Sequence, residues 1–341
     1  MKSLNIGING FGRIGRAAAR IILNDEHFRL SAINSRSDLS SHAYLLKYDT
    51  TYGHFPAKIE TEEGVLKING TKVLVSKSEL PQEIPWGKAK VDIVLECSGK
   101  FLTQEQSMGH LQGSVSYVVL SVPAKDETPT FVLGVNEKNF NPSLHKIISN
   151  SSCTTNCLGP ILSVLDRDLG IQRAFATTIH AVTDSQNLLD NSHKKEVRLR
   201  RSAMACLIPT SSGAGKDVAK ILPHLAGKIF LRSLRIPLLT VSLIDLTAEI
   251  SKKTSKEEVN QVFEKEAKGR LRQIIEVAQE EFVSSDFIGN PHSAIFDPFL
   301  TEVAQGNLVK VFAWYDNEWA YAQRLVDLAY YIAKKSHLYE N

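Results

Sequence analysis

The segment Leu4–Gly15, LNIGINGFGRIG, decides the fold of the first half of this chain. An apolar run leads into Gly10, Gly12 and Gly15, spaced as GxGxxG, and residues 14–23 then carry apolar side chains at helical spacing. Glycines allow a tight turn and a close approach of the backbone to a pyrophosphate, which the N–H groups of the following helix bind. A strand, a glycine turn and a helix in this order predict a dinucleotide-binding site. The alternative is a merely structural turn.

Further apolar runs continue this pattern along the first half of the chain. The runs that we interpret as buried strands are residues 4–9, 28–34, 91–95, 117–122 and 146–148. Short buried strands that alternate with helix-like segments are typical of βαβ units and of a parallel sheet. We therefore expect an α/β fold with a Rossmann dinucleotide-binding domain over residues 1–152.

The pattern changes after residue 152. The longer and more alternating runs are 175–183, 228–236, 241–250 and 308–316. Alternation of apolar and polar side chains is typical of a sheet with one face covered by helices, so we expect an α+β domain with a mostly antiparallel sheet over residues 153–318. Ser255 and Glu258 have capping-box spacing, which predicts the start of one covering helix. A last helix within residues 319–341 is expected to pack back on the first domain.

Length and composition fit this two-domain plan. A chain of 341 residues, 43% hydrophobic and 23% charged, is typical of a globular protein with two domains. The formal net charge of +3, without a basic stripe interleaved with aromatic residues, implies no nucleic-acid partner. We find no run of about 18 apolar residues and no signal-peptide pattern, so we expect a cytoplasmic protein without a membrane segment. The four cysteines form no pair of CxxC motifs, so neither a disulfide scaffold nor a metal site is expected.

The end of the second expected strand bears on the choice of cofactor. In this fold an acidic residue about 20 positions beyond the glycine turn normally binds the ribose 2′-hydroxyl of NAD. Here Asn34, Ser35 and Arg36 stand where the acid is expected. Ser35 can donate a hydrogen bond and Arg36 can pair with a phosphate, which favours NADP. The alternative is that Arg36 simply points into solvent.

Two residues of the second half are candidates for covalent catalysis. Cys153 precedes a helical run at 158–165, and a helix N-terminus stabilises a thiolate. His180 ends the apolar run 176–179. A lone histidine in such a run is more often a core residue, but beside an activated cysteine it becomes a candidate general base. The sequence therefore predicts Cys153 as a nucleophile and His180 as its base.

Five motifs carry a family resemblance by their order and spacing: INGFGRIGR (8–16), SNSSCTTNC (149–157), TTIH (177–180), RIP (235–237) and WYDNEW (314–319). With them the whole chain resembles the phosphorylating glyceraldehyde-3-phosphate dehydrogenases. The resemblance implies a homotetramer whose subunits join a Rossmann domain to a catalytic domain with an eight-stranded sheet. It also implies that Cys153 attacks the aldehyde of glyceraldehyde 3-phosphate and that inorganic phosphate then releases an acyl phosphate. NADP and NAD are the cofactors it implies.

The resemblance further implies a set of binding residues. Asn317 would hold the nicotinamide carboxamide, and Thr183 and Arg235 would hold the substrate phosphate. The residues that would line the second, inorganic-phosphate site are Ser152, Thr154, Ser212 and Gly213. The further cofactor contacts are Phe11, Arg13, Ile14, Ser98, Ser121 and Tyr321.

Two departures from the family pattern lie in the segment after His180. Leu199 stands where an anion-binding arginine is expected, so Arg200 or Arg198 would have to take that role. The alternative for the basic stretch 194–201, which includes Lys195, is a solvated surface. Asn191 and Ser192 replace the Leu-Pro common in NAD-preferring members. Ser192 resembles the serine that contacts the 2′-phosphate of NADP in a neighbouring subunit, which again favours NADP.

Three other functions compete with this interpretation. Erythrose-4-phosphate dehydrogenase shares the fold and motifs but releases a carboxylate by hydrolysis, and Leu199 keeps that alternative open. A semialdehyde or acyl-phosphate reductase of amino-acid synthesis has a similar domain plan, but its motifs match poorly. A catalytically dead binding protein would have no reason to retain Cys153, His180 and Arg235 together.

Overall fold

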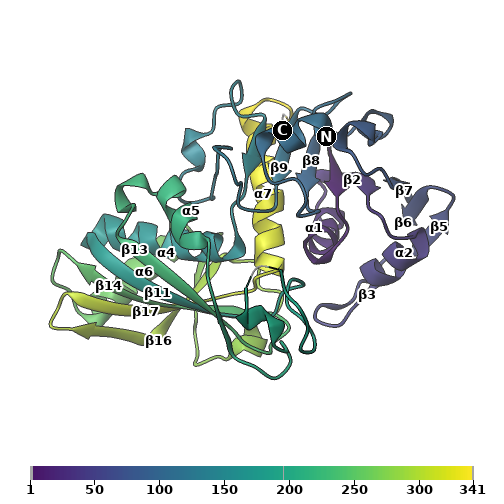
Figure 1. The fold of residues 1–341 in the computed structure, drawn as a ribbon. Coiled ribbons are helices and arrows are strands. Elements are labelled where there is room, and N and C mark those ends of the chain that lie inside the picture. The colour runs from purple at the N-terminus through teal and green to yellow at the C-terminus, as the bar shows by residue number, and fades with distance from the viewer. Residues whose placement is uncertain (1–2, 195, 340–341) are drawn as a thin grey trace. The chain divides into compact units, whose positions relative to one another are not determined.

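The computed structural model describes residues 3–194 and 196–339 (Figure 1). The chain divides into two compact units, each built around a sheet of its own. The first unit consists of Met1–Phe131, Glu137–Ser152 and Tyr321–Asn341, and the second consists of Val132–Asn136 and Cys153–Ala320. In the described part of the chain, no helix is long and apolar enough to cross a membrane.

The first unit contains an eight-stranded sheet in the order β10-β9-β8-β1-β2-β7-β6-β5. Its strands are β1 (Leu4–Asn9), β2 (Phe28–Asn34), β5 (Ile59–Glu62), β6 (Val65–Ile68), β7 (Thr71–Ser76), β8 (Ile93–Glu96), β9 (Tyr117–Leu120) and β10 (Ile147–Ser149). The strands from β10 to β7 are parallel, and the edge strands β6 and β5 are antiparallel. Figure 1 shows the order from β9 through β8 and β2 to β5. The α/β fold predicted from the glycine segment is confirmed.

Helices and short segments complete the first unit. The helices are α1 (Arg13–Leu23), α2 (Leu39–Lys47), α3 (Gln104–Ser107), α7 (Trp319–Lys335, in this unit from Tyr321) and the 3₁₀ turns η1 (Pro81–Glu83), η2 (Trp86–Ala89), η3 (Met108–His110) and η4 (Glu137–Asn139). Strands β3 (Tyr48–Asp49) and β4 (Gly53–His54) form a separate pair. Tyr330 of α7 packs edge-on against Phe28 of β2, with ring centroids 5.7 Å apart.

The strand order reverses between β1 and β8. From β1 the chain adds β2 and β7 on one side, and β8, β9 and β10 then extend the sheet on the other side. Nucleotides bind outside the carboxyl ends of parallel strands at such a switch point. The glycine turn that follows β1 lies there.

The antiparallel hairpin of β5 and β6 is not predicted from the sequence. Its first strand reads IETE and is mostly exposed, so no apolar run marks it. Backbone pairing of β6 with the longer strand β7 places the hairpin at the sheet edge.

The second unit contains a seven-stranded sheet in the order β12-β13-β11-β14-β17-β16-β15. Its strands are β11 (Ile171–His180), β12 (Ile208–Thr210), β13 (Ile229–Arg235), β14 (Ser242–Ile250), β15 (Ile275–Val277), β16 (Ala294–Ala304) and β17 (Leu308–Tyr315). Only the β11–β13 and β15–β16 pairings are parallel, so the mostly antiparallel sheet is confirmed. The eight strands implied by the resemblance are not found among the described residues, since the chain leaves the sheet after His180 and re-enters only at β12.

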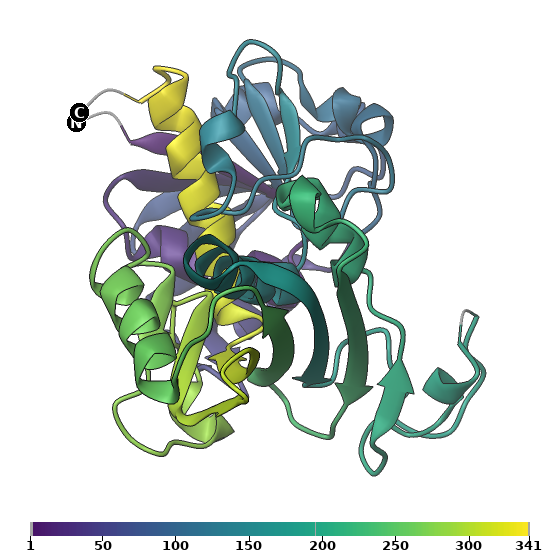
Figure 2. The same cartoon turned by 90° about the vertical axis from the view of Figure 1, so that its left-hand side faces the viewer.

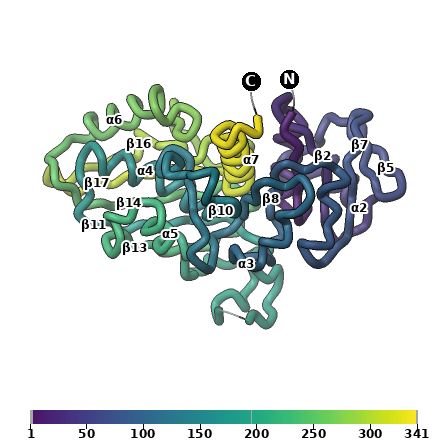
Figure 3. The backbone as a smooth tube through the Cα atoms, turned by 90° about the horizontal axis from the view of Figure 1, so that it is seen from above, coloured from purple at the N-terminus to yellow at the C-terminus, as the bar shows by residue number. Residues whose placement is uncertain are grey.

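Helices cover one face of this second sheet (Figures 1 and 3). They are α4 (Cys153–Leu169), α5 (Ala214–Ile221) and α6 (Lys256–Lys268), beside the 3₁₀ turns η5 (Arg198–Arg200), η6 (Pro223–Leu225) and η7 (Ser284–Phe287). Residues of β14 alternate strictly between buried and half-buried, because one side meets the helices. The capping box is confirmed, since the Glu258 N–H donates to Ser255 Oγ and the Ser255 N–H donates to Glu258 Oε2.

The other face of the second sheet carries exposed aromatic side chains. Phe175 of β11 and Phe230 of β13 are 63% and 52% exposed and stack with ring centroids 5.2 Å apart. The segment 181–207 extends away from the rest of this unit (Figures 2 and 3). Five of its large apolar side chains are exposed, those of Leu188, Leu189, Val197, Met204 and Leu207.

Candidate active site

Cys153 is the first residue of α4, and His180 is the last residue of β11. Cys153 Sγ lies 3.5 Å from His180 Nε2. The parallel pairing of β11 with β13 sets His180 opposite Arg235. The two catalytic candidates named from the sequence therefore meet in one site, with Arg235 beside them.

Two groups compete for the other ring nitrogen of His180. Nδ1 lies 2.7 Å from the Ala181 carbonyl oxygen and 2.6 Å from Arg235 Nη1. The carbonyl can only accept, so that contact needs a proton on Nδ1. The guanidinium can only donate, so its contact needs Nδ1 without a proton. The position of Arg235 therefore decides which nitrogen of His180 carries the ring proton.

Burial dominates the electrostatics of this site. It raises the pKa of the Cys153 thiol, although Arg235 and a hydrogen bond with Thr154 act in the opposite direction. Burial, with a smaller effect of Arg235, lowers the pKa of His180 to about 3. The expectation that the helix N-terminus stabilises a Cys153 thiolate is thus opposed by burial, which makes the predicted base His180 the more important partner. The raised pKa favours a thiol at Cys153, and a neutral His180 can take its proton when Nδ1 carries the ring proton.

The hydroxyl of Tyr315 holds two elements of the site together. It lies 3.1 Å from Thr154 Oγ1 on α4 and 2.8 Å from Thr178 Oγ1 on β11. Burial raises the pKa of Tyr315, so the phenol stays protonated. Sequence reasoning missed Tyr315 and Thr178, although a tyrosine inside the WYDNEW motif and a threonine two residues before His180 were available as signals.

Asn317 is held by residues at the start of β14. Ser242 Oγ donates to Asn317 Oδ1 over 2.9 Å and accepts the Ala181 N–H over 3.1 Å. Because the amide oxygen is used in this way, the NH₂ group of Asn317 is oriented away from Ser242. Next to it, the buried Asp316 accepts the Trp319 N–H at the start of α7. Sequence reasoning did not find Ser242.

The residues proposed for phosphate lie in several places. Thr183 is half-buried, and its hydroxyl lies 3.1 Å from Ser185 Oγ. Ser212 and Gly213 precede α5, of which Gly213 is the N-cap. Thr154 lies on α4, whereas Ser152 is the last residue of a first-unit segment.

The basic stretch around η5 is mostly solvated. Leu199 is buried, and its neighbours Arg198 and Arg200 are exposed. Lys195 lies outside the described residues. Ser192, in the same extended segment, is exposed, with its N–H donating to Asn191 Oδ1.

The glycine turn of the first unit fits a dinucleotide. A Cβ on Gly10 would stand 2.5 Å from the Ser98 backbone, and one on Gly15 would stand 2.2 Å from the Gly10 carbonyl oxygen. Both positions therefore require glycine. No described atom lies within 4 Å of a Cβ built on Gly12, so that side of the turn is open to the approach of a pyrophosphate.

The cofactor-selecting segment after β2 is accessible. Ser35 is half-buried and donates its N–H to Ser76 O, while Arg36 is exposed. The nearest acid along the chain, Asp38, caps α2 through the Ser41 N–H. Hydrogen bonds from Ser40 and Ser41 hold the pKa of Asp38 well below its usual range. An acid that is engaged in this way does not replace the missing ribose ligand.

The other cofactor residues named from the sequence lie in the first unit, except Ser192 and Asn317, which lie in the second. Arg13 pairs with Asp49, and Tyr321 donates its hydroxyl hydrogen to the Ser151 carbonyl oxygen. The side chain of Asn34 is fully used inside the protein, donating to Asn9 and to Ser78 O and accepting from Ser76 and Ser78. The remaining members of the set are Phe11 and Ile14 at the glycine turn, Ser98 after β8 and Ser121 after β9.

Two of the other three cysteines are expected to be poor nucleophiles. Burial raises the pKa of Cys97 to about 12 and also raises that of the fully buried Cys157. Cys206 is half-buried in the segment before β12.

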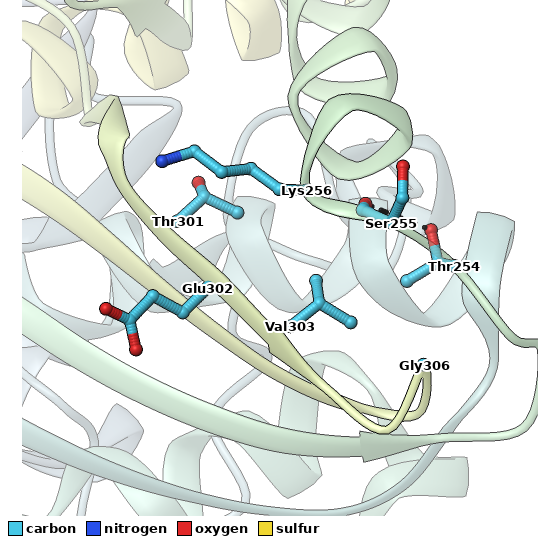
Figure 4. A pocket seen from close by; sticks show the side chains of 7 residues that line it. All are labelled: Thr254, Ser255, Lys256, Thr301, Glu302, Val303 and Gly306. Carbon is cyan, nitrogen blue, oxygen red and sulfur yellow. Dashed lines mark hydrogen bonds between the residues drawn. The ribbon is translucent and has the colours of Figure 1, made fainter.

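A hollow at the start of α6 shares no residue with this site (Figure 4). It is lined by Thr254, Ser255, Lys256, Thr301, Glu302, Val303 and Gly306. The helix N-terminus there is already capped by the Glu258 carboxylate, which disfavours an anion.

Comparisons with known proteins place both units in one family. Residues 4–104 match the family model described as glyceraldehyde 3-phosphate dehydrogenase, NAD binding domain, and residues 152–317 match that of the C-terminal domain. The chain is 42% identical over 332 residues to glyceraldehyde-3-phosphate dehydrogenase 2 of Bacillus subtilis, covering 97% of each chain. It is 42% identical over 333 residues to glyceraldehyde-3-phosphate dehydrogenase of Geobacillus stearothermophilus, covering 98% of this chain and 99% of that one.

Proposed function

The chain belongs to the glyceraldehyde-3-phosphate dehydrogenase family, and from this premise we propose that it oxidises D-glyceraldehyde 3-phosphate to 1,3-bisphosphoglycerate, or catalyses the reverse, with NAD(P). The observation that carries the proposal is the 3.5 Å contact between Cys153 Sγ at the start of α4 and His180 Nε2. A thiol, a neutral imidazole and a helix N-terminus are the parts that acyl transfer through a thioester requires.

The first step forms a bond between Cys153 Sγ and the aldehyde carbon. His180 Nε2 takes the thiol proton as the bond forms, and the positive end of the α4 helix dipole would favour the oxyanion of the resulting hemithioacetal. When bound, oxidised NAD(P) supplies the hydride acceptor. Loss of a hydride from this oxyanion leaves a thioester on Cys153, and His180 keeps the proton that it took from the thiol. An oxygen of inorganic phosphate then attacks the thioester carbon, and the sulfur leaves with a proton returned by His180.

Arg235 links substrate binding to the base. His180 accepts a proton at Nε2 only when Nδ1 carries the ring proton and donates to the Ala181 carbonyl oxygen. The contact between Arg235 and Nδ1 opposes that arrangement. A phosphate group on the substrate offers Arg235 a better acceptor, which draws the guanidinium from His180 and leaves the base in its working form.

The cofactor site follows from the first unit. Gly10, Gly12 and Gly15 would hold the pyrophosphate, and Ser35 with Arg36 would admit the 2′-phosphate of NADP, because no acid stands there to repel it. Ser35→Asp with Arg36→Leu is expected to raise the KM for NADP by at least about tenfold, equal to about 1.4 kcal/mol, with NAD turnover equal or better. Steady-state assays with each cofactor test this. Absence of NADP-dependent turnover in the parent enzyme would show that the cofactor is NAD alone.

In this proposal the two domains have different roles. Residues 1–152 bind the dinucleotide, residues 153–318 carry the chemistry, and the helix within 319–341 belongs with the first domain. We further infer a homotetramer, supported by the exposed apolar side chains of the open sheet face and of segment 181–207. In it, Ser192 of one subunit would reach the cofactor of its neighbour.

Relatives named glyceraldehyde-3-phosphate dehydrogenase do not favour the erythrose-4-phosphate alternative. The test is a steady-state assay of glyceraldehyde 3-phosphate oxidation with inorganic phosphate present or absent. Strict dependence on phosphate supports the phosphorylating reaction with Arg200, Ser212 and Gly213 at the second anion site. Multiple turnovers without phosphate, with 3-phosphoglycerate as product, would contradict it.

A further inference from the structure

A chain of buried polar side chains joins the carboxyl ends of four neighbouring strands, β8, β1, β2 and β7. Asn9 Nδ2 donates to Glu96 Oε2 over 2.5 Å, and Asn34 Nδ2 donates to Asn9 Oδ1 over 2.8 Å. Ser76 Oγ in turn donates to Asn34 Oδ1 over 2.8 Å. Each strand therefore ends in one member of a continuous hydrogen-bonded row.

Glu96 is the acceptor at one end of this row, and its carboxylate meets four donors. Besides Asn9, they are the backbone N–H of Ser98 at 2.7 Å, the Ser98 hydroxyl, and His110 Nε2 at 3.0 Å. His110 Nδ1 accepts the Trp86 Nε1–H over 3.1 Å, so its ring proton is on Nε2. Glu96 is 1% exposed and His110 fully buried. A carboxylate, which only accepts, is the side chain that satisfies all four donors at once.

The carboxylate lies where the strand order reverses. The Ser98 backbone that it holds is the same backbone against which Gly10 packs, with room for no Cβ. The backbone of the glycine turn is thus placed by Ser98, and Ser98 is placed by Glu96. On the other side of Glu96, Asn9 accepts a hydrogen bond from Asn34 Nδ2. The second Asn34 Nδ2 hydrogen is donated to Ser78 O, so the amide has no hydrogen left for a ligand.

We propose that Glu96 is the positioning residue of the dinucleotide site: it fixes Ser98 and the glycine turn without touching the cofactor. Asn34 is thereby reassigned from a cofactor contact to a second positioning residue. This inference rests on the NAD(P) use proposed above. It predicts that cofactor affinity depends on the acceptor chemistry of residue 96 and not only on its volume.

Glu96→Gln tests the inference at nearly constant volume. An amide presents one oxygen and one NH₂ group, so two of the four donors would face another donor. We expect the dissociation constants for NAD and NADP, measured by calorimetric titration without aldehyde, to rise at least about tenfold, equal to about 1.4 kcal/mol. In turnover, the KM for the cofactor should rise while the KM for the aldehyde stays unchanged.

Glu266→Gln is the matched control. Glu266 is also a buried carboxylate, but it lies in the second unit and pairs with Arg167 and Arg270. The substitution Glu266→Gln should lower the melting temperature and leave the cofactor affinity equal to that of the parent protein. Equal cofactor affinity of Glu96→Gln and the parent would overturn the positioning role, as would an equal loss in Glu266→Gln.

Asn9→Ala is a second variant for the case that Glu96→Gln does not fold. It removes one donor from Glu96 and breaks the row toward Asn34, so cofactor affinity should again fall, and unchanged affinity would overturn the inference. The parent protein separates this inference from the proposed function. A parent protein that binds neither NAD nor NADP contradicts the proposed function. A parent that binds them, with variants that bind them equally well, contradicts only the role of Glu96.

Discussion

Cys153 and His180 are expected to act as one unit, because the 3.5 Å contact joins a buried thiol to a neutral imidazole. Cys153→Ser should abolish dehydrogenase activity, since the weaker hydroxyl nucleophile does not form the thioester. His180→Asn should lower kcat by roughly 10²–10⁴-fold, typical of losing a general base. Steady-state assays of the two variants, with folding checked by melting temperature, measure this. Near-normal kcat in either variant would rule out the mechanism.

Arg235 is the residue that should distinguish phosphorylated from unphosphorylated substrates. Arg235→Leu removes a charge-assisted contact worth about 1.5–3 kcal/mol, so kcat/KM for glyceraldehyde 3-phosphate should fall roughly ten- to hundredfold. Glyceraldehyde without the phosphate should be little affected. Comparison of kcat/KM for the two aldehydes checks this, and equal losses for both would show that Arg235 has another role.

The same substitution has a pH consequence. Burial raises the pKa of Cys153, and Arg235 is the largest influence that lowers it. Arg235→Leu should therefore move the pH profile of Cys153 alkylation by iodoacetamide to higher pH, since the thiolate loses a nearby positive charge. Rates measured between about pH 6 and 10, in the parent and the variant, decide this. A shift toward lower pH would contradict the assigned electrostatics.

At the scale of elements, the start of β14 connects two strand ends of the second unit. Val241 has a left-handed φ of 66°, unusual for a β-branched residue, and its neighbour Ser242 bonds both Ala181 and Asn317. Residues held in such conformations cluster at functional sites. We infer that the strained start of β14 helps to place Ser242, which orients Asn317.

Ser242→Ala should weaken that orientation. It leaves the buried Ala181 N–H and the Asn317 amide oxygen without their partner, at a cost of about 1–3 kcal/mol. We expect a higher KM for the cofactor and a lower melting temperature. Thr247→Ala, on the same strand, is the control that should change neither by much. An unchanged KM for the cofactor in Ser242→Ala would show that Asn317 keeps its orientation without the serine.

At the scale of the whole molecule, the open face of the second sheet is the feature that a single chain leaves unexplained. Phe230→Asp would place a charge in the stacked pair with Phe175, so a subunit interface there should dissociate. Light scattering coupled to size-exclusion chromatography measures the mass directly. Glu264→Lys, on the exposed side of α6, is the control that should leave the assembly intact. If Phe230→Asp keeps the mass of a tetrameric parent, the subunit interface does not lie on this face of the sheet. A parent that is itself monomeric would contradict the tetramer.

Local patterns were enough to predict much of this protein. The glycine turn after β1, the buried strands of the parallel sheet and the capping box of α6 depend on near neighbours in the chain, so their residues could be read directly. The fold class and the family followed from these segments and from five motifs. The antiparallel edge strand β5 was missed because its side chains are largely exposed, and its place depends on a partner strand.

Only the tertiary structure decided how the chemical groups act on one another. Burial raises the pKa of Cys153, the pairing of β11 with β13 brings Arg235 onto His180, and Tyr315 joins residues far apart in the chain. Desolvation depends on everything that packs around a group, and a hydrogen bond depends on atoms that the fold brings together from distant segments. For that reason the sequence by itself determined which residues are the candidates for the chemistry, while the tertiary structure determined their burial and hydrogen-bond partners and led us to propose Ser242 and Glu96 as positioning residues.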